Sequence, residues 1–169
     1  MNYSGLVKND IANGRGVRVS LFVSGCSLHC KGCFNEEIWD FNSGKKFTED
    51  TQNNIIAELQ KKYYTGFSLL GGEPFDQDKK TLLNLILAIK SNTKIKDFWV
   101  WSGHNYEELI SSPDSLLLLN EFDVLIDGKF EIGQKDASLA FRGSSNQRII
   151  DLNKTREKGE IVLYDVNRV

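Results

Sequence analysis

Short apolar strands alternate with amphipathic helices along this chain of 169 residues, and that alternation limits the possible fold more than any other feature. Strands are predicted where β-branched and aromatic residues gather between turn-forming residues. They lie at 17–25, 66–72, 97–103 and 123–127, with weaker candidates at 148–150 and 161–164. Helices are predicted at 48–63, where Thr48 and Thr51 suit a capping box, at 78–91, and from Tyr106 onwards.

Strands that alternate with helices form right-handed βαβ units around a parallel sheet. A closed eight-stranded barrel built from such units takes about 250 residues, so 169 residues are too few to complete one. We therefore expect one α/β domain over 1–169, an incomplete, open (β/α) barrel of about five to six mostly parallel strands. The loops after the four main strands should meet at one edge of the sheet, where barrel enzymes carry their chemistry.

Composition narrows the class of protein. Forty per cent of the residues are hydrophobic, enough for a proper core, and the formal net charge is −2. Lysines and arginines are spread along the chain, so no basic stripe indicates nucleic-acid binding. The first residues lack the features of a signal peptide, and the apolar runs are too short to span a bilayer. We therefore expect a cytoplasmic protein without nucleic-acid or membrane partners.

The only cysteines, Cys26, Cys30 and Cys33, lie within eight consecutive residues. Three thiols leave one unpaired in any disulfide scheme. They can instead hold three irons of a [4Fe-4S] cube, which normally takes four cysteines, and leave the fourth iron open to a small molecule. Two alternatives stay open. A zinc site with His29 as fourth ligand would lack the usual paired knuckles, and a redox pair of Cys30 and Cys33 would leave Cys26 without a role.

A second motif, Gly71-Gly72-Glu73-Pro74, ends the strand that follows the cysteines by one βα unit. Glycines let a backbone approach a ligand closely, and the carbonyls and Glu73 can accept hydrogen bonds from an ammonium group. An ordinary turn at the end of a strand would also use glycine and proline. The position of the motif after the cysteines favours the interpretation as a binding turn.

The C-x3-C-x2-C spacing and the Gly-Gly-Glu-Pro turn resemble those of the radical S-adenosylmethionine enzymes. The resemblance implies that Cys26, Cys30 and Cys33 ligate a [4Fe-4S] cluster and that S-adenosyl-L-methionine is the second cofactor. It also implies that Lys129, in the Asp127-Gly128-Lys129 element, pairs with the carboxylate of the methionine moiety. Members usually carry an aromatic residue before the third cysteine, where this chain has Gly32. The residues implied in cofactor binding are Gly32, Cys33, Phe34, Gly71, Gly72, Glu73, Asp127 and Lys129.

Further segments resemble, within that superfamily, the activating proteins of the anaerobic ribonucleoside-triphosphate reductase. These segments are 21–26, 30–35, 99–103, 126–130 and 142–147. The stretch from Asn13 to Arg18 is similar to one in glycyl-radical activating enzymes, with Arg15 in place of proline. The resemblance runs from Met1 to about Asp151, and the tail at 152–169 lies outside it.

The resemblance implies an oxidoreductase that uses its cluster and S-adenosylmethionine to generate a 5′-deoxyadenosyl radical. The radical abstracts hydrogen from a glycine in the large subunit of the reductase, and an external donor such as flavodoxin supplies the electron. One alternative is another radical enzyme, such as the activase of pyruvate formate-lyase or an enzyme that acts on a small molecule. The other is a zinc or iron–sulfur binding module without catalysis.

Overall fold

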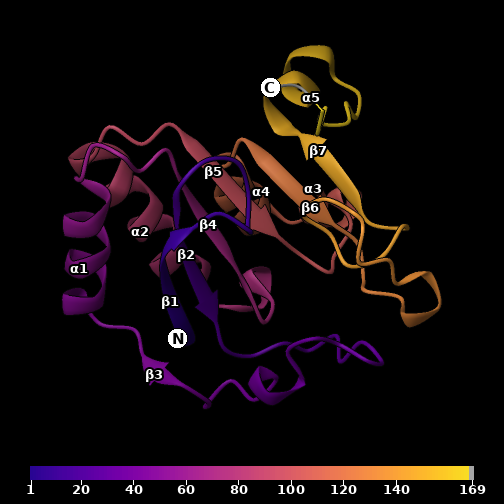
Figure 1. Ribbon diagram of the computed structural model, residues 1–169, viewed down its shortest axis with the longest axis horizontal. Helices are drawn as coiled ribbons and strands as arrows, with labels where there is room; N and C mark the ends of the chain where they lie inside the picture. The colour runs from indigo at the N-terminus through magenta and orange to yellow at the C-terminus, as the bar shows by residue number, and fades with distance from the viewer. Residues whose placement is uncertain (168–169) are drawn as a thin grey trace.

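The structure is a computed structural model and describes residues 1–167. Within this range, seven strands form one open sheet in the order β3-β1-β2-β4-β5-β6-β7 (Figure 1). The strands are β1 (Asn2–Asp10), β2 (Arg18–Val23), β3 (Lys45–Lys46), β4 (Gly66–Gly71), β5 (Asp97–Trp101), β6 (Val124–Asp127) and β7 (Arg148–Asp151). The helices are α1 (Glu49–Leu59), α2 (Lys79–Asn92), α3 (Tyr106–Ser111), α4 (Pro113–Leu119) and α5 (Leu152–Lys158), with 3₁₀ turns η1 (Glu36–Ile38), η2 (Pro74–Asp76) and η3 (Ile132–Gln134).

The four central strands, β2, β4, β5 and β6, run parallel, while β1, β3 and β7 pair antiparallel at the sides. The two edge strands of the sheet do not pair with each other, so the expected open α/β barrel with mostly parallel central strands is confirmed. The strand count exceeds five to six because the sequence did not reveal β1 and β3. Of the two weaker candidates, 148–150 lies in β7, whereas 161–164 contributes only a single bridge, from Leu163 to Ile150.

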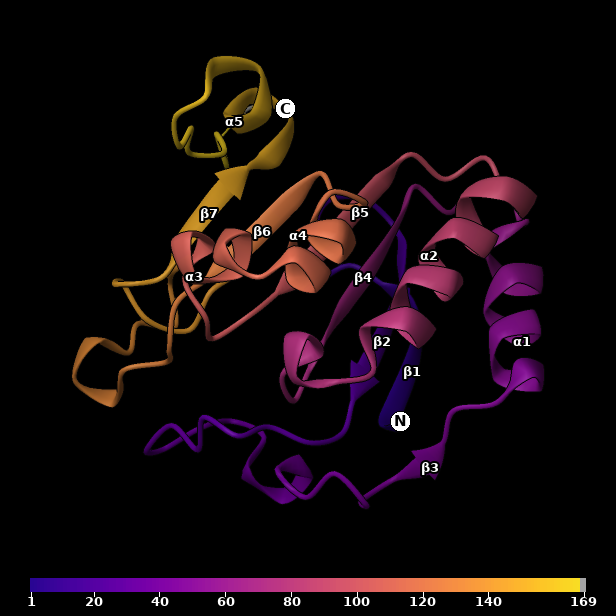
Figure 2. The ribbon, with the colours of Figure 1, turned by 180° about the vertical axis from the view of Figure 1, so that it is seen from behind.

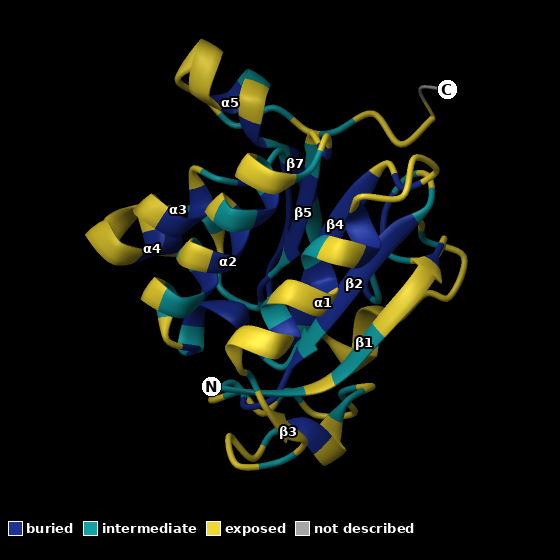
Figure 3. Ribbon diagram, turned by 90° about the vertical axis from the view of Figure 1, so that its left-hand side faces the viewer, coloured by how far each residue is buried: buried dark blue, intermediate teal, exposed yellow. Residues whose placement is uncertain are grey.

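Alternate residues of a strand face opposite sides of the sheet. Helices α1 to α4 cover one side (Figure 2), and the main core lies there, around residues such as Leu21, Leu69 and Val100. The other side, called the inner side below, carries a second cluster. That cluster consists of Trp99, Val124, Ile126 and Ile149, with Trp101, Phe141 and Tyr164 packed against them. Both tryptophans of β5, Trp99 and Trp101, therefore face the inner side. Figure 3 shows β2 and β4 largely buried, whereas β1 is partly buried along one stretch and exposed along another.

Local hydrogen bonds determine where the first helix begins and ends. The Thr48 hydroxyl accepts from the Thr51 N–H at 3.3 Å, and the Thr48 N–H donates to the Thr51 hydroxyl at 3.4 Å, which is the predicted capping box. Helix α1 stops at Leu59, short of the predicted end, since the chain turns there and buries Tyr64, whose hydroxyl donates to Glu58 at 2.8 Å. Among the helices of residues 1–167, none combines the length and apolar character that crossing a membrane requires.

Candidate functional site

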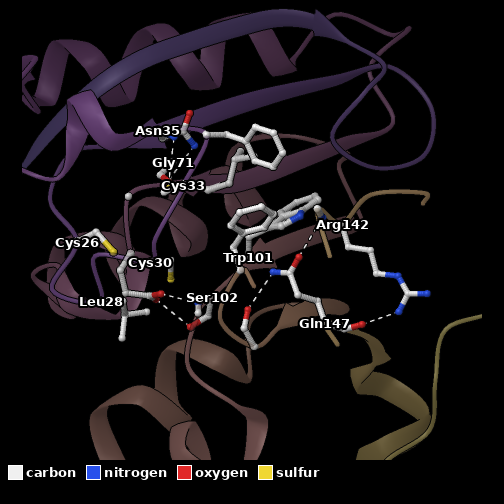
Figure 4. Close-up of a pocket in the computed structure, with 18 of the residues that line it drawn as sticks. Cys26, Leu28, Cys30, Cys33, Asn35, Gly71, Trp101, Ser102, Arg142 and Gln147 are labelled. Atoms are coloured by element: carbon white, nitrogen blue, oxygen red, sulfur yellow. Dashed lines mark hydrogen bonds between the residues drawn. The ribbon is translucent and has the colours of Figure 1, made fainter. Parts of the chain in front are cut away.

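A cavity of about 410 Å³ lies where the loops after the four parallel strands meet, as the sequence predicted (Figure 4). Four segments contribute to its wall. They are the loop at 24–39 after β2, called the cysteine loop below, the turn Gly71-Gly72-Glu73-Pro74 after β4, called the glycine turn, Ser102-Gly103 after β5, and Gly128 after β6. All three cysteines line it. In Figure 1 the cysteine loop and the loop at 129–147 both project beyond the ends of the parallel strands, so they form its two outer walls.

The cysteine loop is closed on itself by backbone hydrogen bonds at its base. The Gly25 N–H donates to the Ile38 carbonyl at 2.8 Å, and the Cys26 N–H donates to the Trp39 carbonyl at 3.1 Å. His29 adopts a positive φ of 44°, and its ring stacks on Trp39 at 4.5 Å between centroids. The loop therefore presents its thiols from a defined backbone, while the imidazole of His29 packs on an aromatic ring.

The cysteine thiols suit a cube better than a single ion. Within residues 1–167, no group of three His, Cys, Asp or Glu side chains could hold one metal ion. A cube does not require such convergence, because each thiolate binds a different iron. The Cys33 sulfur also accepts the Asn35 N–H at 3.4 Å. Burial raises the pKa of the Cys26 thiol, so binding of a metal would have to displace its proton.

The glycine turn is packed directly against the base of the cysteine loop. The Gly72 N–H donates to the Val23 carbonyl and the Glu73 N–H to the Gly25 carbonyl, both at 2.8 Å. A Cβ atom on Gly72 would lie 2.2 Å from the Gly25 oxygen, and one on Gly71, where φ is 109°, 2.7 Å from the Val23 oxygen. Both positions therefore require glycine, and the two motifs form one structural unit.

Glu73 connects this unit to the loop after β5. Its side chain is buried and accepts hydrogen bonds from the Phe75 N–H at 2.9 Å, the Ser102 hydroxyl at 2.9 Å and the Gly103 N–H at 2.7 Å. Burial raises the pKa of Glu73 to about 7 in spite of these donors. A carboxylate has about four acceptor positions, so one remains for a cationic group of a ligand in the cavity.

Asp76 and His104 hold the cysteine loop from the outside. The Asp76 carboxylate accepts from the Ser27 N–H at 2.8 Å and the Ser27 hydroxyl at 2.7 Å, and its other oxygen lies 3.3 Å from His104 Nε2. Although burial opposes ionisation, these hydrogen bonds lower the pKa of Asp76 to about 2. The hydrogen bond to Asp76 raises the pKa of His104. No sequence motif indicated a role for Asp76, although Asp76 lies only three residues beyond Glu73.

The sequence-predicted residues do not all reach the cavity. Five of them line it together with the other two cysteines, namely Cys33, Phe34, Gly71, Gly72 and Glu73. Gly32 lies outside the lining, beside Ile132. The buried Asp127 carboxylate accepts from the Tyr106 N–H at 2.8 Å and from Arg148, so it holds α3 and β7 in place.

Lys129 is exposed and lies between two lining residues, Gly128 and Phe130. Its carbonyl accepts a hydrogen bond from Asn146 Nδ2 at 2.8 Å, a contact that does not identify a ligand. The roles of Gly32, Asp127 and Lys129 in cofactor binding therefore stay predictions.

The wall opposite the cysteines includes Arg142, Gly143 and Gln147 of the segment at 142–147, for which the sequence left two roles open, lining the cofactor or docking the partner. The Gln147 side chain accepts from the Gly143 N–H at 2.9 Å and donates to the Gly128 carbonyl at 2.9 Å, so it ties this segment to the end of β6. Figure 4 shows the Arg142 guanidinium directed away from the cysteines, where it donates to the Gln147 carbonyl. Trp101 Nε1 donates to the Phe141 carbonyl at 2.8 Å and completes this wall.

Comparison with known proteins places the chain in a family. Residues 12–150 match the family described as a 4Fe-4S single cluster domain. The anaerobic ribonucleoside-triphosphate reductase-activating protein of Vibrio cholerae is 41% identical over 152 residues, which cover 88% of this chain and 97% of the relative. That of Escherichia coli K12 is 41% identical over 150 residues (87% and 96%), and that of Enterobacteria phage T4 is 38% identical over 150 residues (88% and 93%). The chain belongs to the family of anaerobic ribonucleoside-triphosphate reductase-activating proteins.

Proposed function

We propose that this protein activates an anaerobic ribonucleoside-triphosphate reductase by creating a glycyl radical in its large subunit. The observation that carries the proposal is that one cavity collects all three cysteines and the Gly71-Gly72-Glu73 turn. In the proposal, Cys26, Cys30 and Cys33 ligate a [4Fe-4S] cluster, and S-adenosylmethionine binds beside it. The cluster would supply, when bound, the single electron needed to cleave S-adenosylmethionine to methionine and a 5′-deoxyadenosyl radical, the species that would abstract hydrogen from the glycine.

The residues of the chain bind and orient these groups. Glu73 and the carbonyls of the glycine turn would accept hydrogen bonds from the ammonium of the methionine moiety, since one acceptor position of the carboxylate remains and its environment is dry. Lys129, with Asp127 behind it, would face the carboxylate of that moiety. Backbone groups from Gly32 to Phe34 would hold the adenine.

Apolar side chains on the opposite wall would keep water and stray hydrogen donors away from the radical. Trp101 and Phe141 line the cavity there, and both belong to the cluster on the inner side of the sheet. The protein thus contributes binding, orientation and exclusion of water, while the cofactors supply the reactive electrons.

Two further components belong to the proposal. An external one-electron donor such as a flavodoxin would reduce the cluster. The cytoplasm would be the site of action, which suits a cluster that oxygen destroys.

Anaerobic reconstitution with iron and sulfide, followed by reduction in the presence of S-adenosylmethionine and the large subunit of the cognate reductase, tests the function. We expect a stable glycyl radical in the electron paramagnetic resonance spectrum, with the doublet that its α-hydrogen produces. A Cys30→Ala variant in the same mixture is the control and should give no signal. The proposal is wrong if the wild type gives no glycyl signal with the reductase yet converts a free small molecule.

A further inference from the structure

Residues 152–166, beyond the residues that match the 4Fe-4S family, fold back onto the sheet. Helix α5 ends at Gly159, where a φ of 72° reverses the chain. The following residues then run beside β7. The Asp151 N–H donates to the Val162 carbonyl at 2.9 Å, and the Tyr164 N–H donates to the Ile149 carbonyl at 2.8 Å. We call Ile161–Val166 the C-terminal strap.

The strap reaches across the inner side of the sheet to the loop that precedes β2. The Tyr164 ring packs edge-on against the buried Trp99, with centroids 5.2 Å apart at 72°. The Arg15 guanidinium lies over the same ring at 5.3 Å. Arg15 Nη2 also donates to the Val166 carbonyl at 2.7 Å and to the Asp165 carbonyl at 3.1 Å. Because β4, β5 and β6 separate β2 from β7 in the sheet, this contact joins two strands that no ladder connects.

The two residues that the strap contacts, Arg15 and Trp99, are each linked to a residue that lines the cavity. The Asn13 carbonyl, two residues before Arg15, accepts the Ser68 hydroxyl at 2.6 Å, and the Arg15 carbonyl accepts Arg18 Nη1 at 2.9 Å. Asn13 itself lines the cavity. On the other side, Trp99 packs edge-on against Phe141, another lining residue, at 5.0 Å and 77°.

We propose that the C-terminal strap positions two parts of the cavity wall, the Asn13 loop through Arg15 and Phe141 through Tyr164 and Trp99. In this open sheet no hydrogen-bond ladder fixes the distance between the loop before β2 and the segment beside β7. The strap supplies that restraint on the inner side. Arg15 and Tyr164 are therefore positioning residues for the ligand of the cavity. The identity of that ligand as S-adenosylmethionine rests on the proposed function, whereas the restraint on the loop does not.

The test compares three single variants of the reconstituted full-length protein and one double variant, Arg15→Gln with Tyr164→Ala. Arg15→Gln removes the cation but leaves the strap backbone intact, and Tyr164→Ala removes the ring. Tyr164→Phe keeps the ring and is the matched control. Amide hydrogen exchange of residues 11–16 reports the restraint on the loop, and equilibrium dialysis of S-adenosylmethionine reports the state of the cavity. Iron content shows whether the cluster is retained.

We expect Arg15→Gln and Tyr164→Ala to speed amide exchange at 11–16 and to raise the Kd for S-adenosylmethionine about tenfold, with unchanged iron content. Tyr164→Phe should match the wild type in both measurements, and the double variant should show less than the sum of the single effects because the two side chains act through one contact. Unchanged exchange in Arg15→Gln, or faster exchange with an unchanged Kd, overturns the proposal. A wild type that fails to bind S-adenosylmethionine would count against the proposed function, while the exchange measurement would still decide whether the strap restrains the loop.

Discussion

At the scale of single residues, the three thiols determine what the site can bind. Because the chain has no fourth cysteine, each thiolate would be the sole cysteine ligand of one iron in the proposed cluster. We predict that the reconstituted wild type binds about four irons and four sulfides, and that replacement of Cys26, Cys30 or Cys33 by alanine abolishes the cube. His29→Ala is the control. Since its ring stacks on Trp39, this variant should keep the full iron and sulfide content. Iron and sulfide analysis measures both, and loss of metal in His29→Ala would revive the zinc interpretation.

Glu73 holds the loop after β5 by hydrogen bonds, and in the proposed function it also binds an ammonium group. One substitution can separate these two roles. Glu73→Gln keeps the shape but removes the charge that would bind an ammonium group. We expect the cluster to persist and the Kd for S-adenosylmethionine to rise about tenfold to hundredfold, which corresponds to the loss of a charge-assisted hydrogen bond of roughly 1.5–3 kcal/mol. Equilibrium dialysis measures the affinity. Equal affinity in the variant would show that the glycine turn is purely structural.

The buried position of Glu73 also predicts a pH dependence of stability. Burial raises its pKa in the folded state to about 7, above the ordinary glutamate pKa of 4.5, so the folded state binds more protons between these values. The free energy of unfolding should therefore fall as pH rises through this window, by at most about 3 kcal/mol from this group. His104 acts in the same direction, since its pKa is also raised. Urea unfolding at roughly pH 5 and pH 8 should show a smaller decrease for Glu73→Gln than for the wild type. An equal decrease would assign the effect to other groups.

At the scale of elements, the glycine turn and the cysteine loop act as one unit because their backbones touch. Gly72→Ala would place a Cβ 2.2 Å from the Gly25 oxygen, so one of the two backbones has to move. We expect this variant to lose about 1–3 kcal/mol of stability and to retain less iron after reconstitution. Gly133→Ala is the matched control, because a Cβ there meets no atom within 4 Å. Thermal unfolding and iron analysis of both variants test the prediction, and similar behaviour of the two would contradict it.

The same scale shows what the sequence could and could not predict. The four parallel strands were predictable because each is a short apolar run followed within two residues by a glycine. Strand β1 was not, since exposed polar residues such as Lys8 and Asn9 interrupt its pattern and its partner strand supplies the pairing. The roles of Asn13, Phe141 and Gln147 depend on contacts between segments that are distant in the chain, and no local pattern encodes these.

At the scale of the whole molecule, the open sheet leaves one side of the site accessible. The cavity lies between two projecting loops, and Phe34, which lines it, is 60% exposed. Abstraction of hydrogen requires the glycine in near contact with the radical carbon, so a loop of the reductase must enter the mouth and the partner must cover the exposed side. The protein alone has no such cover within residues 1–167.

This geometry predicts that activation and cofactor cleavage are coupled only in the complex. The reduced protein by itself should cleave S-adenosylmethionine slowly and without a stable radical, because water and small hydrogen donors enter the cavity from the side that only the partner would cover. Addition of the reductase large subunit should increase the rate of cleavage. Most of the S-adenosylmethionine cleaved should then be matched by a glycyl radical. Parallel measurement of 5′-deoxyadenosine by chromatography and of the radical by electron paramagnetic resonance gives the matched fraction. A large subunit in which the target glycine is replaced by alanine is the control, and it should cover the site without forming the radical. If the isolated protein cleaves the cofactor as fast as the complex does, the site does not need its partner to close it, and this account of the open barrel is wrong.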